Sequence, residues 1–126
     1  MKIKHTGLNI RFRVDVEKFY HDLLGFRTTS NFKLNRALSE ALFGIDSETE
    51  VLYLVNDKVE LELFFNPEPV SGGYNHICLE VNNLDKFVAK AKQAGFLHYY
   101  QERSNKQPLV FIKDYSGNIF EVKERL

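Results

Sequence analysis

The sequence predicts an α+β fold built from two βαβββ modules in a chain of 126 residues. Three observations support this. Two strand-like segments share one pattern and begin with histidine, "HTGLNI" at 5–10 and "HICLEV" at 76–81. Each is followed by an amphipathic helix pattern, and each helix pattern is followed by three strand-like stretches. Because this length suits a single domain with a real core, the repeat indicates one domain that contains a duplicated unit.

The helices are expected in "VDVEKFYHDLLGF" and "NNLDKFVAKAKQAGF". In both, apolar residues recur at i, i+3, i+4 and i+7, which is the spacing of a helix with one buried face. These residues are Val16, Phe19, Tyr20 and Leu23 in the first helix, and Leu84, Phe87, Val88 and Ala91 in the second. Asp15 and Asn83 stand at the expected N-caps, and Gly25 and Gly95 stand just after the expected ends.

The strands of the first module are expected in "FRTTSNFKL", "EVLYLVN" and "KVELELFF", with a hairpin turn at 56–58. Between the first two, "NRALSEALFG" predicts a short extra helix that carries Leu38, Leu42 and Phe43 and ends at Gly44. The strands of the second module are expected in "LHYYQE", "PLVFIKD" and "NIFEVKE", with "YSGN" as a turn.

The modules are therefore expected at residues 1–66 and 74–126. The segment 67–73, with the proline and glycine content typical of a linker, is expected to join them.

Composition narrows the class of protein. Lys+Arg and Asp+Glu balance at 17 each, which argues against a nucleic-acid partner and gives no support to a membrane-surface partner. No apolar run approaches the roughly 20 residues of a membrane span, and the first residues lack the apolar centre of a signal peptide. A single cysteine, Cys78, excludes an intrachain disulfide framework. We expect a cytoplasmic protein.

Polar side chains gather on one predicted sheet face. Strand side chains alternate between faces, so each strand can be divided into two sets. The face without helices is expected to carry His5, Gly7, Asn9, Glu60, Glu62 and Phe64 in the first module, and His76, Cys78, Glu80, Ile119, Glu121 and Lys123 in the second. One histidine or glutamate at such a place is usually an ordinary solvated residue. The repetition in both halves favours a divalent ion, because two imidazoles with two carboxylates suit Ni²⁺, Zn²⁺, Co²⁺, Fe²⁺ or Mn²⁺.

The chain resembles the vicinal oxygen chelate superfamily, the glyoxalase/bleomycin resistance/dioxygenase fold. The resemblance rests on "HTGLNI", "VEKFYHDLLGF", "VELELFFN", "YNHICLEV" and "FIKDYSGNIFEVKE", and it covers nearly the whole chain. This superfamily includes glyoxalase I (lactoylglutathione lyase), methylmalonyl-CoA epimerase, extradiol dioxygenases, and fosfomycin- and bleomycin-resistance proteins. The pattern of metal ligands is most similar to that of glyoxalase I.

The resemblance implies the ligand set His5, Glu62, His76 and Glu121. It implies one divalent ion per site, with nickel or zinc expected before cobalt, manganese or iron. The implied activity is a lyase or isomerase that acts on the thiol hemithioacetal of a 2-oxoaldehyde through a metal-bound enediolate. Glu121 is implied as the catalytic base, with Glu62 as its partner on the opposite side.

The resemblance also implies that the site combines His5 and Glu62 of one module with His76 and Glu121 of another. The second module would belong either to the same chain or to the partner in a homodimer.

The small-molecule substrate is expected to be an adduct of glutathione or another thiol. Asn66 matches an asparagine that helps to hold glutathione in glyoxalase I, whereas Asn9 replaces its glutathione-binding arginine. Apolar wall residues are expected among Phe64, Cys78, Tyr53 and Tyr74, with plain core packing as the alternative. Arginine and lysine contacts to the substrate stay open at Arg11, Arg13, Arg103 and Lys106, where solvated surface charge is the alternative.

Two alternatives remain. The first is another enzyme on the same site: an epimerase, an extradiol dioxygenase, or a thiol transferase acting on an antibiotic epoxide. By resemblance, epimerases tend to place glutamine where this chain has Glu62, and the other two use two histidines and one glutamate. The second is a non-catalytic binding protein for a drug or small ligand, of the bleomycin-resistance kind, which generally lacks the ligand set.

Overall fold

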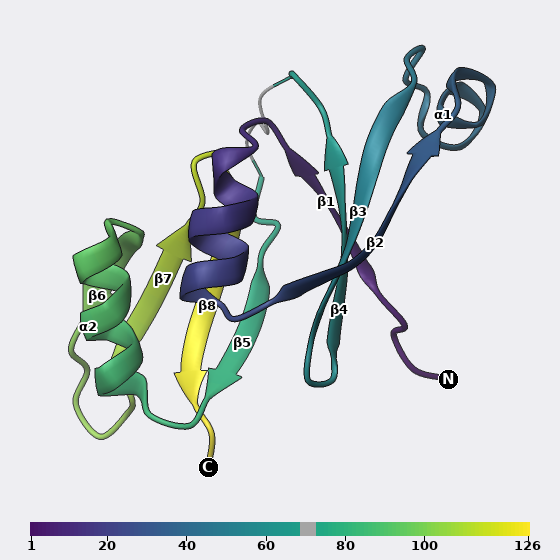
Figure 1. Cartoon of the computed structure of the whole chain (residues 1–126). Coiled ribbons are helices and arrows are strands. Elements are labelled where there is room, and N and C mark those ends of the chain that lie inside the picture. Colours follow the sequence, from purple (N-terminus) through teal and green to yellow (C-terminus); the bar gives the residue numbers. More distant parts are fainter. Residues whose placement is uncertain (69–72) are drawn as a thin grey trace. The chain divides into compact units, whose positions relative to one another are not determined.

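The structure is a computed structural model that describes residues 1–68 and 73–126. The chain divides into two compact units, unit 1 at Met1–Pro69 and unit 2 at Val70–Leu126. Each unit contains one four-stranded sheet together with helices (Figure 1). The predicted α+β fold with two βαβββ modules is therefore confirmed. Most of the expected linker, residues 69–72, lies outside the described residues.

Unit 1 has the sheet order β1-β4-β3-β2. Strand β1 runs parallel to β4, and the other neighbouring pairs are antiparallel. The elements are β1 (Thr6–Ile10), η1 (Val16–Leu23), β2 (Arg27–Leu34), α1 (Arg36–Phe43), β3 (Thr49–Asn56) and β4 (Val59–Phe65).

Unit 2 repeats this topology with the sheet order β5-β8-β7-β6. Its first strand is again parallel to its last, and the other pairs are antiparallel. The elements are β5 (Ile77–Val81), α2 (Leu84–Ala94), β6 (Leu97–Gln101), β7 (Leu109–Lys113) and β8 (Ile119–Glu124). No helix in the described part of the chain has the length and apolar character needed to span a membrane.

The last strand of each unit in chain order, β4 or β8, shows the predicted alternation of buried apolar and outward-facing polar residues. Leu61 and Leu63 in β4 are buried, as are Phe120 and Val122 in β8. The glutamates between them project to the opposite face, with their side chains 14% exposed at Glu62 and 17% at Glu121. Because strand side chains alternate, burial of the apolar residues on one face determines which residues project from the other face.

Helix η1 buries all four predicted apolar residues but begins differently from the expectation. It is wound as a π-helix, so the Leu24 amide donates to the Phe19 carbonyl five residues earlier, at 3.0 Å. Asp15 stands at the N-cap position, as predicted, but its side chain makes no capping hydrogen bond. A turn in which the Asp15 amide bonds the Phe12 carbonyl leads directly into the helix, so Asp15 already has helical dihedrals and is buried.

Helices α1 and α2 have the predicted ends. Asn35 and Asn83 accept a bond from the amide three residues later, at 2.9 Å in each case. Gly44 and Gly95 follow with positive φ, at +71° and +84°. The apolar residues expected in α1, Leu38, Leu42 and Phe43, are all exposed, whereas Ser39 is buried.

Replacing Gly95 with alanine should lower the free energy of unfolding by about 1–2 kcal/mol, the cost of a left-handed backbone for an L-residue. No atom lies within 4 Å of a Cβ built there, so the effect would come from the backbone and not from a clash. Gly95→Asn should cost less, because asparagine tolerates this conformation better. Urea denaturation measures both, and an alanine variant as stable as the wild type would contradict the assignment.

Candidate functional site

The first candidate pair lies on the polar face of the unit 1 sheet. His5 immediately precedes β1, and the parallel register places Gly7, two residues later, opposite Glu62. The imidazole reaches diagonally across, and its Nε2 lies 2.5 Å from Glu62 Oε1. The Tyr53 ring of β3 meets the His5 ring edge-on, with centroids 5.9 Å apart. The structure thus brings together the two residues expected from this half of the chain.

The second pair repeats this placement in unit 2. His76 immediately precedes β5, and Cys78, two residues later, lies opposite Glu121. His76 Nε2 is 3.7 Å from Glu121 Oε2. The offset from histidine to glutamate is therefore the same in both units. Such identity of register is what duplication of one half-site would produce.

A backbone contact fixes the chemistry of His76. Its Nδ1 lies 2.8 Å from the Tyr74 carbonyl oxygen. A carbonyl only accepts, so Nδ1 carries the hydrogen and Nε2 presents its lone pair toward Glu121. Metal-binding histidines characteristically donate their other ring N–H to a carbonyl or carboxylate in this way. Tyr74, expected as a wall residue, contributes this carbonyl, while its own residue surface is almost fully exposed.

Neither His–Glu pair is by itself a complete set of ligands for a divalent ion. In residues 1–68 and 73–126, no three or more His, Cys, Asp or Glu side chains form a ready ligand group. The candidates come as one His–Glu pair in each unit. His5 Nε2 and Glu62 Oε1 lie at hydrogen-bond distance, which requires a proton between them, and a bound divalent ion would take the place of that proton. Two imidazoles and two carboxylates would together suit a borderline divalent metal.

The neighbouring Glu60 is held differently from Glu62. The Tyr53 hydroxyl donates to Glu60 Oε1 at 2.8 Å, and Lys4 Nζ lies 3.1 Å from Glu60 Oε2. The bond from Tyr53, followed by that from Lys4, lowers the pKa of Glu60 below its ordinary value, and the same bond to Glu60 raises the pKa of Tyr53. Tyr53 is therefore a hydrogen-bond donor to a surface carboxylate and not simply an apolar wall.

Cys78 lies beside Glu121 on the same face. Partial burial of the sulfur raises the pKa of the thiol, and the Glu121 charge raises it further. A thiol kept protonated is a poor nucleophile. The raised pKa therefore argues against Cys78 as a catalytic thiol.

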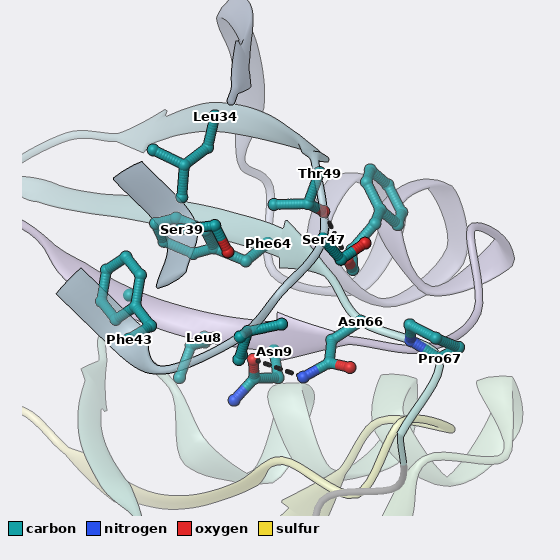
Figure 2. A pocket seen from close by; sticks show the side chains of 13 residues that line it. Leu8, Asn9, Leu34, Ser39, Phe43, Ser47, Thr49, Phe64, Asn66 and Pro67 are labelled. Atoms are coloured by element: carbon teal, nitrogen blue, oxygen red, sulfur yellow. Dashed lines mark hydrogen bonds between the residues drawn. The ribbon is translucent and has the colours of Figure 1, made fainter. Parts of the chain in front are cut away.

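The other expected substrate-binding residues gather at the far end of the unit 1 sheet. Asn9, Phe64 and Asn66 line a pocket of about 330 Å³ (Figure 2). The Asn66 side-chain amide donates to the Asn9 side-chain oxygen at 3.4 Å. Sequence reasoning missed Ser39 and Phe43, which line the same pocket. Their i, i+4 spacing, which places two residues on one helix face, was the available signal.

Three arginines considered for substrate binding already have protein partners. Arg13 pairs with Glu50 at 2.5 Å, and its guanidinium lies 4.0 Å from the centre of the Phe65 ring. Arg11 lies over the Phe12 ring at 5.1 Å. Arg103 donates from Nε to the Gln107 carbonyl at 2.8 Å. Lys106 lies in the same segment and is exposed.

Comparison with known families decides the classification. Residues 2–122 match the model of the Glyoxalase/Bleomycin resistance protein/Dioxygenase superfamily. The chain belongs to this superfamily. No curated protein gives a significant match to the chain.

Solved structures of the superfamily share the fold at low sequence identity. A glyoxalase family protein from Enterococcus faecalis is 19% identical, with a TM-score of 0.70, 96% of this chain covered and 95% of that one. A glyoxalase family protein from Bacillus cereus is 14% identical, with a TM-score of 0.76 and coverages of 100% and 95%. A variant of the fosfomycin resistance protein FosX from Listeria monocytogenes, solved with Mn(II) and 1S,2S-dihydroxypropylphosphonic acid, is 12% identical, with a TM-score of 0.73 and coverages of 96% and 90%.

Tyr53→Phe should raise the pKa of Glu60 toward its ordinary value, because the carboxylate loses the hydrogen bond that contributes most to the shift. A carboxyl with a depressed pKa adds stability above its unfolded-state pKa and loses it as pH falls through its folded-state pKa, so the variant should lose part of this acid-side stability. Carbon-detected NMR titration of the glutamate carboxyls measures the shift. Glu80, an exposed glutamate of β5 in the other unit, serves as the internal reference, and an unchanged Glu60 titration would contradict the assignment.

Proposed function

We propose that the chain is a divalent-metal-dependent enzyme of glyoxalase type that isomerises a thiol hemithioacetal of a 2-oxoaldehyde. One observation supports this above the others. The same His–Glu pair occurs at the same register in both units, and His76 holds the tautomer that leaves Nε2 as a ligand atom. Neither pair alone supplies enough protein ligands for a catalytic site, which typically uses three or more.

In this proposal, His5 and Glu62 form one half-site and His76 and Glu121 form the other. The halves come from one chain or from the two subunits of a homodimer, and either arrangement gives one site per chain. Nickel and zinc suit the mixed nitrogen and oxygen donors, and the Listeria protein solved with Mn(II) supports manganese, which was already among the candidates.

The bound ion would act as a Lewis acid on two adjacent substrate oxygens, which makes the neighbouring C–H more acidic. The Glu121 carboxylate would then remove the proton from the carbon that bears sulfur and hydroxyl and return it to the adjacent carbonyl carbon, while the hydroxyl proton passes to the former carbonyl oxygen. No atom is gained or lost, and the product is a 2-hydroxy thioester. In this arrangement Glu62 would lie on the opposite side of the ion, and Cys78 is the neighbour of Glu121 in the sheet.

A second candidate is the opening of an antibiotic epoxide. It is favoured by the likeness to the Listeria fosfomycin resistance protein, whose complex contains a dihydroxypropylphosphonic acid. Two features make it the weaker candidate. By resemblance, such enzymes use two histidines and one glutamate, so Glu62 is an extra ligand. The pocket beside the first half-site is also lined by uncharged residues, which a phosphonate dianion does not match.

Metal-stripped protein should bind about one Ni²⁺ or Zn²⁺ per chain, because each site needs one pair from each unit. His76→Ala and Glu62→Gln should each weaken this binding by about 100-fold or more, since loss even of outer-shell partners costs roughly 10- to 100-fold. Calorimetric titration measures stoichiometry and affinity.

Matched controls for the titration lie close by. Glu60→Gln changes a glutamate two residues away that is already bonded to Tyr53 and Lys4, and His98→Ala removes an exposed histidine of β6. Both controls should bind metal like the wild type. Binding that neither site variant weakens would exclude the four-ligand site.

Glu121→Gln should lower kcat for hemithioacetal isomerisation by about 10²- to 10⁴-fold at saturating metal, because the general base is lost. Thioester formation measures turnover. Exchange of the substrate C–H in D₂O, followed by NMR, measures proton removal directly. Wild-type exchange together with slow turnover would assign Glu121 a role after proton removal, and turnover at the wild-type rate would exclude it as the base.

A further inference from the structure

The pocket of unit 1 lies between the polar face of its sheet and the segment that contains α1 (Figure 2). The sheet contributes residues from all four strands. Helix α1 and the residues that lead from it into β3 cover the opposite side. At about 330 Å³, the pocket lies at the lower end of the roughly 300–1,000 Å³ range of small-ligand sites.

The pocket wall nearest to β1 is aromatic. Phe43 of α1 meets Phe64 of β4 edge-on, with ring centroids 5.5 Å apart. Gly7 leaves room for the Phe64 ring, because a Cβ at this position would lie only 3.2 Å from a ring carbon. Ser39, one helical turn before Phe43, is 2% exposed and adds a hydroxyl to the same wall. The pocket thus has an apolar body assembled from three distant parts of the sequence.

The far end of the pocket is polar but neutral. Two carboxamides meet there, with Asn66 donating to Asn9 at 3.4 Å. The Asn66 oxygen accepts from the Glu68 amide at 3.0 Å, which fixes which way this side chain points. Carboxamides offer donors and acceptors without charge, so this end suits a ligand amide, hydroxyl or carbonyl.

No lining residue of this pocket carries a charge. The nearby Arg13 guanidinium is paired with Glu50 and lies over the Phe65 ring. A carboxylate or phosphonate that entered the pocket would lose its water without gaining a cationic partner, which is costly. An uncharged ligand meets no such penalty.

The pocket adjoins the first candidate metal pair. Gly7, which lines the pocket, lies opposite Glu62 in the sheet, and Phe64 follows Glu62 on the same face. A molecule whose reacting oxygens lie at His5 and Glu62 would therefore extend along β1 and β4 into the pocket.

We infer that this pocket selects the non-reacting end of the substrate, and that this end is an uncharged group with an aromatic or branched apolar body and a hydrogen-bonding tip. The inference rests on the proposed function, which assigns the reacting end of the substrate to the candidate metal ligands. It predicts that the charged arms of glutathione do not occupy this pocket and that a neutral substituent does.

Phenylacetamide and phenylacetate test the inference, because they have the same shape and differ in charge. The full-length chain is kept metal-free with a chelator, and each probe is titrated while backbone amide shifts are followed by NMR. Phenylacetamide should bind with a Kd of about 1 mM and shift the amides of Gly7, Ser39 and Asn66. Phenylacetate should bind at least about 10-fold more weakly because its charge has no partner.

Phe43→Ala should weaken phenylacetamide binding about 3- to 10-fold through loss of the ring contact. Leu42→Ala is the matched control, since Leu42 is the adjacent helix residue, is 64% exposed and does not line the pocket. Phe64→Leu gives a second test that does not alter α1. Equal or tighter binding of phenylacetate, shifts away from these residues, or no shifts with either probe would overturn the inference.

The two proposals fail separately. The probe titration uses neither metal nor turnover, so its failure would leave the metal titration of the four candidate ligands unaffected. Loss of metal binding would likewise leave a neutral-ligand pocket standing. That combination would indicate the binding-protein alternative.

Discussion

The parallel pairing of the first strand with the last strand in each unit places every candidate ligand. A βαβββ chain that pairs its ends in this way brings a residue just before β1 next to one in the middle of β4, although more than fifty positions separate them. The pairing is fixed by burial of the opposite face, where Leu61 and Leu63 flank Glu62. A slip of one residue would move Glu62 into the core and expose the leucines. The positions of the candidate ligands thus depend on a strand register set by apolar burial more than on attraction between the ligands.

The two His–Glu pairs share the same strand register but differ in their local contacts. His5 contacts Glu62 directly, whereas His76 stays 3.7 Å from Glu121. The difference follows from local partners. His76 is tied to the Tyr74 carbonyl, and Glu121 lies 3.8 Å from the Lys123 ammonium as well as opposite Cys78. The two glutamates therefore have different surroundings in the two units.

The features that depend on short-range periodicity were predictable from the sequence. Strand alternation identified the two faces, helix periodicity identified η1 and α2, and asparagine with glycine marked the ends of α1 and α2. Two features depended on information that periodicity lacks. Leu38, Leu42 and Phe43 predicted the helix α1 but not which of its residues lines the pocket, and the lining includes Ser39 and Phe43, with Phe43 against Phe64. Asp15 has a residue type suited to an N-cap. The turn that precedes it gives it helical dihedrals, however, and its side chain makes no capping bond.

The two units differ most in the connection between their second and third strands. In unit 1 this connection carries α1 and covers a pocket, whereas in unit 2 the equivalent residues 102–108 form a short connection that follows β6 directly. Pairing of the first and last strands, which positions the His–Glu pairs, is common to both. Duplication therefore preserved the elements that hold the candidate ligands, while the inserted segment is free to vary without disturbing them. In the proposed function, strand register would set the metal chemistry, and the connection outside the sheet would set the choice of substrate.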